Sequence, residues 1–190
     1  YCLKRLPPEA ARYLDLIRNS TVGAIGGKVV KSYIFGQAVA TIAGHAHRSR
    51  PGIDVLQLPE DFLEKFYGGP VASDYKSYQG KARMVWWHEL LFAVCDAIGF
   101  CRFQTAFTTP HAPNWDEYSK FIYLATGLNL PVAELKEIAE RIYTMERLLL
   151  GRMGVGTREF DVAPESWYKE PVPAGAAAGE VRDMNKWQEM

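Results

Sequence analysis

The sequence predicts an all-α fold, a multi-helix orthogonal bundle. Apolar residues recur at spacings of three and four along 131–153, and proline, asparagine and glycine stand where helices should begin and end. Strand signal is confined to the short run 28–31, where it is weak. The 190 residues are 48% hydrophobic and 23% charged, values typical of a globular protein and not of a disordered chain.

The first half of the chain predicts four helices. Prolines at the first helical positions open a helix that runs over about 7–19. A helix over 33–46 is rich in glycine and alanine, which favours close packing against neighbours or against a ligand. A short helix covers 58–68 and a long one roughly 78–98, where Gly99 supplies the stop.

The second half predicts two further helices and a tail. Asn114 caps a helix over 115–125, and the next helix runs over 131–153 until several glycines end it. We expect a helical domain at 1–164 and a Pro/Gly/Ala-rich C-terminal tail at 165–190 that wraps a surface. The apolar stripe of helix 131–153 predicts its core face: Leu135, Ile138, Ile142, Met145 and Leu149.

The segment 84–94 of the long helix is apolar almost all round. A helix of this kind is buried on every side. We therefore expect it at the centre of the bundle or under another domain.

The balance of charge excludes several classes of partner. Lys and Arg together equal Asp and Glu at 22 each, so nothing indicates binding to nucleic acid or to an anionic membrane. The longest uncharged run, 32–47, is too polar for a membrane span. An odd count of three cysteines favours a reducing compartment, the cytoplasm. Because the chain begins at Tyr1 and stops in mid-pattern at Met190, we expect a segment of a longer protein.

Asp96 combines an acidic side chain with apolar surroundings. It lies in the last turn of helix 78–98, where its charge opposes the helix dipole and where we expect poor solvation. A buried carboxylate needs N–H donors. An arginine such as Arg83 or Arg102 supplies them, and so does the amino-pyrimidinone edge of a pterin. The residues by themselves leave both partners open.

Cys101 follows the predicted helix stop, with Arg102 beside it. Positive charge stabilises a thiolate, which favours a reactive or ligating cysteine. The alternative is a small buried apolar side chain, which we expect of Cys95 inside the helix. A four-iron cluster takes four thiolates, so these two cysteines cannot hold one alone.

The histidines give weaker signals. His45 and His47 are two residues apart, so on a helix they face apart and do not form a metal pair. At the end of that helix one of them would line a cleft as an acid or base. We expect His88 to be a hydrogen-bonded core residue and His111 to be exposed.

The run Asp96-x-x-Gly99-Phe100-Cys101 resembles the aldehyde ferredoxin oxidoreductase family, whose motif is Asp-x-x-Gly-Leu followed by Cys or Asp. Residues 38–41 followed by His47 resemble the family's Ala-Tyr-Ala-Thr stretch that leads to Cys-His near the metal, although Ala46 replaces Cys. The resemblance covers about 30–190, and its late part consists of Glu140 to Tyr143, Glu146-Arg147, Gly154, Arg158, Pro164 and Glu170-Pro171.

This resemblance implies the all-α, C-terminal domain of a larger chain. Its cofactors would be tungsten (or molybdenum) on two pterins and a 4Fe-4S cluster, both completed by residues outside this chain. Asp96 would contact a pterin, Cys101 would ligate the cluster, and His47 would be the catalytic residue facing the substrate. The other cofactor-binding positions that the resemblance implies are Gly99, Phe100, Arg102 and Arg48.

Three hypotheses of function follow. The first is oxidation of aldehydes to carboxylic acids, with ferredoxin or another iron-sulfur carrier as electron partner. The second is the dearomatising branch of the family, the class II benzoyl-CoA reductases, because His45 and Ala46 depart from the aldehyde pattern. The third, of another class, is a non-catalytic bundle that binds a partner protein or a second copy of itself through the apolar Trp86-Trp87 segment.

Overall fold

The computed structural model describes residues 29–41, 51–107, 109–154, 157–158, 161 and 165–190. Every regular element in these residues is a helix, which confirms the predicted all-α class. The predicted helix at 7–19 lies outside the described residues. The elements are α4 (Lys31–Val39), η1 (Gly52–Leu56), α5 (Glu60–Tyr67), α6 (Lys81–Ile98), η2 (Arg102–Gln104), α7 (Trp115–Thr126), α8 (Val132–Arg152), α9 (Ser166–Lys169) and α10 (Met184–Glu189).

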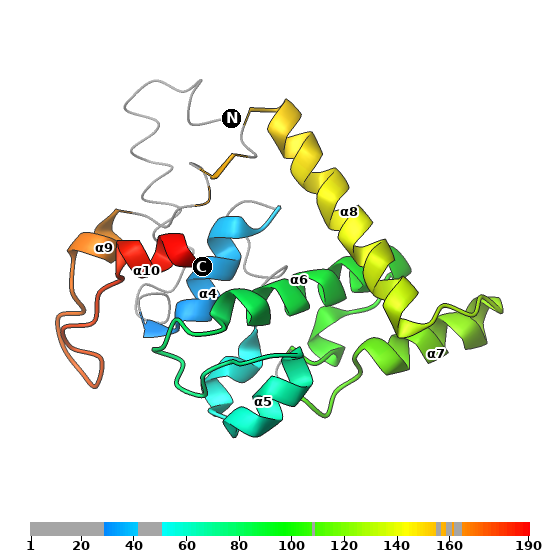
Figure 1. The fold of residues 1–190 in the computed structure, drawn as a ribbon, viewed down its shortest axis with the longest axis horizontal. Helices are drawn as coiled ribbons and strands as arrows, with labels where there is room; N and C mark the ends of the chain where they lie inside the picture. The colour runs from blue at the N-terminus through cyan, green and yellow to red at the C-terminus, as the bar shows by residue number, and fades with distance from the viewer. Residues whose placement is uncertain (1–28, 42–50, 108, 155–156, 159–160, 162–164) are drawn as a thin grey trace.

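Helix α6 lies at the centre of the fold, with α4, α5 and α8 packed on it (Figure 1). From Met84 to Cys95 its side chains are buried, except that Trp86 is 39% exposed and Trp87 is half-buried. This confirms the expectation of a buried central helix. The main core lies between α6, α7 and α8, where Phe92 and Leu91 pack against Tyr118 and Leu135.

The helix boundaries follow local signals in the sequence. Gly68, Gly99 and Gly127 end α5, α6 and α7 in the left-handed conformation, in which glycine carries no steric penalty. At the start of α7 the Glu117 carboxylate accepts the backbone N–H of Asn114 at 3.1 Å, one half of a capping box. These starts and stops match the predicted ones to within a few residues.

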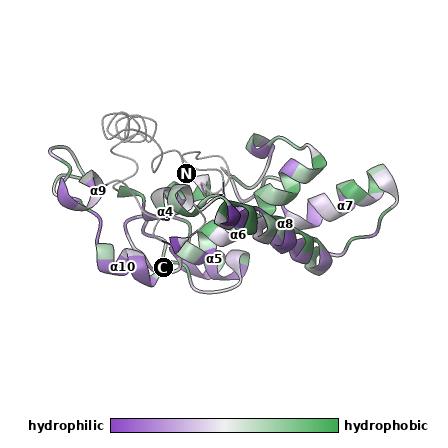
Figure 2. Cartoon of the chain, turned by 90° about the horizontal axis from the view of Figure 1, so that it is seen from above, coloured by the Kyte–Doolittle hydropathy of each residue, from purple (hydrophilic) through white to green (hydrophobic). Residues whose placement is uncertain are grey.

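Helix α8 departs from the prediction along half of its length. Leu135 is 2% exposed, whereas Met145 and Leu149 are 69% and 60% exposed. The prediction that the whole stripe is core is therefore wrong for the distal half. Helix α8 crosses α6 with its first half and then runs on beyond the bundle (Figure 1), and it carries hydrophobic and hydrophilic residues along its length (Figure 2).

Helix α4 is shorter than predicted in the part that can be compared. It ends at Val39, and its C-cap Ala40 leaves the helical conformation with φ −56° and ψ 137°. The predicted continuation to residue 46 falls partly on 42–50, outside the described residues.

The C-terminal residues fold back on α4. Trp187 is 4% exposed and meets Phe35 edge to face, with the ring centroids 5.4 Å apart. The Arg182 guanidinium is buried and donates to the carbonyls of Val30 (3.2 Å) and Lys31 (3.4 Å). Burial lowers the pKa of Arg182 to about 10. The division into 1–164 and 165–190 stays a prediction.

None of the helices in the described ranges is long and apolar enough to cross a membrane.

Candidate functional site

The C-terminal end of α6 is shaped by a Schellman motif. The Phe100 N–H donates to the Cys95 carbonyl at 2.8 Å, and the Gly99 N–H donates to the Asp96 carbonyl at 3.3 Å. Gly99 has a φ of +71°, and a Cβ placed there would meet nothing within 4 Å. The backbone conformation alone therefore selects glycine in the Asp-x-x-Gly pattern.

Asp96 is held by Arg102 across this turn. Arg102 Nε donates to Asp96 Oδ1 at 2.9 Å, and Nη2 donates to Oδ2, which makes the pair bidentate. The two side chains keep 33% and 18% of their surface exposed, so the expectation that Asp96 is poorly solvated is wrong for this chain. The physical reason is that the last turn of α6 emerges from the core. Of the two arginines considered, Arg83 instead donates to the Gly68 carbonyl.

The two cysteines near this turn differ in environment. Cys95 is buried, its thiol donates to the Tyr118 hydroxyl at 3.3 Å, and burial raises its pKa to about 11. It is the core thiol that we predicted. Cys101 is exposed, directly beyond Phe100, whose ring packs on Tyr118 and Phe121. Cys101 is thus the thiol that another group can reach.

A second ion pair lies at the opposite end of α6, and the sequence analysis missed it. Lys81 Nζ donates to Asp54 Oδ1 at 2.6 Å and to the Ala72 carbonyl at 2.8 Å. The Ser32 hydroxyl donates to Asp54 Oδ2 at 2.5 Å. Burial raises the pKa of Asp54, while Lys81 and Ser32 favour its charged form. The cluster joins α4, η1 and α6 and its three side chains are buried, so its role is structural.

His88 is the core histidine that we predicted. Its ring is fully buried, and Nε2 lies 3.0 Å from the Tyr67 hydroxyl. Desolvation lowers its pKa to about 3, so the ring is neutral at physiological pH. His111 is exposed, as expected. Neither histidine lies at the C-terminal end of α6.

The end of α4 is fixed by side chains from α8. The Tyr143 hydroxyl and Arg147 Nη1 both donate to the Val39 carbonyl at 3.3 Å. The Thr41 hydroxyl donates to Glu146 Oε2 at 2.6 Å. Arg147 also makes a bidentate pair with Asp161, at 3.0 and 2.6 Å. The chain is therefore anchored directly before residue 42. The predicted residues His45, His47 and Arg48 belong to 42–50, which lies outside the described residues.

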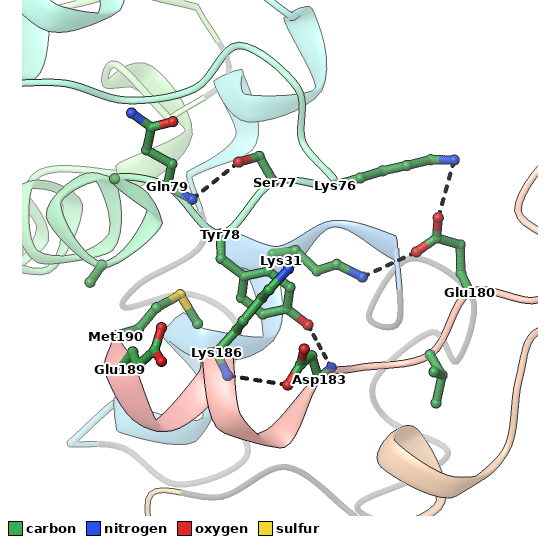
Figure 3. A pocket seen from close by; sticks show the side chains of 13 residues that line it. Lys31, Lys76, Ser77, Tyr78, Gln79, Glu180, Asp183, Lys186, Glu189 and Met190 are labelled. Atoms are coloured by element: carbon green, nitrogen blue, oxygen red, sulfur yellow. Dashed lines mark hydrogen bonds and ion pairs between the residues drawn. The ribbon is translucent and has the colours of Figure 1, made fainter.

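A cavity of about 700 Å³ lies between the start of α6 and α10. Figure 3 shows Lys31 and Lys76 converging on Glu180, at 3.3 and 3.4 Å. The backbone N–H of Asp183 donates to the Tyr78 hydroxyl at 2.8 Å (Figure 3). These contacts join the C-terminal residues to the bundle. Lysines and carboxylates are balanced around the cavity, so its charge does not favour a bound ion of either sign.

The side chains at the C-terminal end of α6 fit part of a ligand set for a metal cofactor, not a complete one. Among the described residues no three His, Cys, Asp or Glu side chains converge as a metal site. Cys101 is the accessible thiol there, whereas Cys95 is buried. A four-iron cluster takes four thiolates, so this end of α6 offers one ligand of such a cluster. A carboxylate has about four acceptor sites, and Arg102 binds both oxygens of Asp96.

The family model of the aldehyde ferredoxin oxidoreductases, domains 2 and 3, matches residues 17–190. The chain belongs to the aldehyde ferredoxin oxidoreductase family. This confirms the resemblance that the motif at 96–101 suggested. The individual roles of Asp96, Cys101 and His47 stay predictions.

Relatives of this chain within the aldehyde ferredoxin oxidoreductases are much longer than it is. The tungsten-containing aldehyde ferredoxin oxidoreductase of Pyrococcus horikoshii is 29% identical over 139 residues, which is 73% of this chain and 22% of that protein. The enzyme of the same name from Pyrococcus abyssi is 28% identical over the same shares of both chains. That of Thermococcus kodakarensis is 29% identical over 101 residues, 53% of this chain and 16% of that protein. The chain thus spans about a fifth of the length of these relatives. No solved structure matches it.

Proposed function

We propose that this chain is the helical part of a tungsten-containing, bis-pterin and iron-sulfur oxidoreductase that oxidises aldehydes to carboxylic acids. The observation that carries the proposal is the family match over 17–190 together with an α6 end where Asp96, before a Schellman turn, and Cys101, directly after it, are both exposed. The relatives named above bear the name tungsten-containing aldehyde ferredoxin oxidoreductase. Molybdenum is the alternative to tungsten as the metal. We expect ferredoxin or a similar iron-sulfur carrier as electron acceptor.

The residues of this chain hold and orient the cofactors. When bound, the metal-pterin group supplies the redox chemistry and the cluster passes electrons onward. The Cys101 thiolate is the cluster ligand, and the Schellman turn fixes the backbone between Asp96 and Phe100, the residue before Cys101. The Asp96 carboxylate accepts N–H bonds from the pterin edge while Arg102 sets its orientation. His47 is the proposed proton acceptor near the substrate.

Metal analysis of the anaerobically purified native enzyme tests this proposal. We expect tungsten or molybdenum with about four irons per metal, as one cubane cluster requires. Cys101→Ala should lose the cluster iron and its paramagnetic signal. Cys95→Ala is the matched control, because Cys95 lies six residues away in the sequence but is buried. It should keep both.

Two outcomes would contradict the proposal. A folded enzyme without tungsten or molybdenum would make the Asp96–Arg102 pair a surface ion pair only. Unchanged iron in Cys101→Ala would remove Cys101 from the ligand set while leaving the family in place.

The substrate is tested separately. Assays with aldehydes and with aryl-CoA thioesters under a low-potential dye separate aldehyde oxidation from the dearomatising alternative. The named relatives favour aldehydes. A non-catalytic helical module is the third alternative, and it would show turnover with neither substrate and no metal.

A further inference from the structure

The distal half of α8 carries an apolar stripe that the described helices do not cover. Met145, Leu148 and Leu149 are 69%, 64% and 60% exposed, and Met153 at the helix end is 45% exposed. Their spacings of three and four place them on one face of α8. The same stripe is core at Leu135, so it leaves the bundle as a continuation of the interior.

This half of α8 is held firmly despite its exposure. On the other side of the helix, Tyr143 and Arg147 bind the Val39 carbonyl, and Arg147 is paired with Asp161. At 100° per residue these positions lie roughly opposite Met145 and Leu149. The polar side therefore fixes the helix against α4 and presents the apolar side outward.

A groove adjoins the stripe. It has a volume of about 640 Å³ and meets the stripe at Leu148, while Tyr143 and Arg147 line it from the polar side of α8 and Trp86 from α6. The Trp86 and Tyr143 rings meet edge to face, with their centroids 5.0 Å apart. Long aliphatic side chains beside an aromatic groove are typical of a permanent interface and not of a surface exposed to solvent.

We propose that the rest of the same polypeptide, the part of the enzyme outside residues 1–190, packs against this stripe and groove. The chain spans about a fifth of its relatives' length and matches domains 2 and 3 of the family model, so most of an enzyme of that length remains to be placed against it. The inference rests on the proposed function, which makes this chain part of a larger enzyme.

Photo-cross-linking in the intact native enzyme tests this assignment. A benzophenone amino acid incorporated in place of Leu148 is irradiated under anaerobic conditions, and the joined peptides are read by mass spectrometry. We expect a link to a peptide outside residues 1–190, within a single polypeptide of unchanged mass. Position 145 serves as a second site should the first variant fold poorly. Phe62, 37% exposed on α5, is the control position, and it should not join the same peptide.

Each other outcome overturns the proposal. A link that doubles the polypeptide mass assigns the face to a second copy. A link within residues 1–190 of one copy assigns it to this chain's own residues. Absence of any link at positions 145 and 148 shows an open face. Tungsten and iron are measured on the same sample, so a wrong interface in a metal-loaded enzyme is distinguished from failure of the proposed function.

Discussion

The two ends of α6 use the same ingredients with opposite results. Each end has a glycine in the left-handed conformation, and each has an aspartate paired with a cation. At the N-terminal end the Lys81 and Asp54 side chains are 0% and 1% exposed, whereas at the C-terminal end the Arg102 and Asp96 side chains are 18% and 33% exposed. Burial, not residue type, separates an ion pair that holds the fold from one that is accessible to a ligand.

The largest expected effect is at the buried end. Lys81→Met leaves Asp54 charged and buried without its cation, which should lower the free energy of unfolding by about 3–5 kcal/mol. Urea unfolding followed by tryptophan fluorescence measures it. The double variant Lys81→Met with Asp54→Leu removes both charges and should recover much of the loss. A change below about 1 kcal/mol in the single variant would refute a structural role for the pair.

The two glycines give the next contrast. A Cβ at Gly80 would lie 2.2 Å from the Pro70 carbonyl oxygen, whereas a Cβ at Gly99 would meet nothing within 4 Å. Gly99→Ala should therefore cost only the left-handed conformation, about 1–2 kcal/mol. Gly80→Ala should cost clearly more, because backbone must move. Thermal unfolding of both variants makes the comparison, and equal losses would contradict it.

The pH dependence of stability should report the buried core beside α6. His88 has a pKa of about 3 when folded, below its unfolded value of about 6.5. Below about pH 6.5 the unfolded chain binds a proton on this ring that the folded chain does not bind, so the free energy of unfolding falls as the pH drops. The slope for one such group reaches about 1.4 kcal/mol per pH unit. His88→Gln should lose this slope between about pH 6.5 and pH 4 in urea titrations. A parallel wild-type and variant profile would disprove the assignment.

The smallest effect on stability is expected at the exposed pair. Asp96→Asn should change the free energy of unfolding by less than about 1 kcal/mol, because the pair is partly solvated. Under the proposed function the same variant should nevertheless lose tungsten and pterin from the native enzyme. Asp116→Asn, at an exposed position on α7, is the matched control and should lose neither. Retained pterin in Asp96→Asn would show that the carboxylate does not contact it.

Local signals made much of the fold predictable. Gly68, Gly99 and Asn114 mark helix ends through backbone conformation and capping, which depend on neighbouring residues only. The apolar run around Phe92 marks the central helix for the same reason. The family motif at 96–101 likewise lies within one turn and its cap.

Long-range features were out of reach. Nothing in the sequence spacing links Asp54 with Lys81, 27 positions apart, or with Ser32. Periodicity identified the stripe of α8 but not where α8 leaves the bundle, because that depends on where α6 and α4 end beneath it. The sequence leaves the partner of Asp96 open between an arginine and the edge of a pterin, and the structure pairs it with Arg102 across the turn.

The buried guanidinium of Arg182 bears on the order in which the chain folds. It donates to the carbonyl of Lys31, a residue 151 positions earlier. During synthesis at about 5–20 residues per second, Arg182 is added roughly 8–30 s after Lys31. Helix α4 packs on α6, which emerges within that interval, so the bundle centre with α4 should assemble first and the contact between Arg182 and Lys31 should form last. Contacts between residues so far apart in sequence form slowly, so docking of the C-terminal residues on α4 should be the slow last step. Until then the face of α4 that they cover is exposed to aggregation.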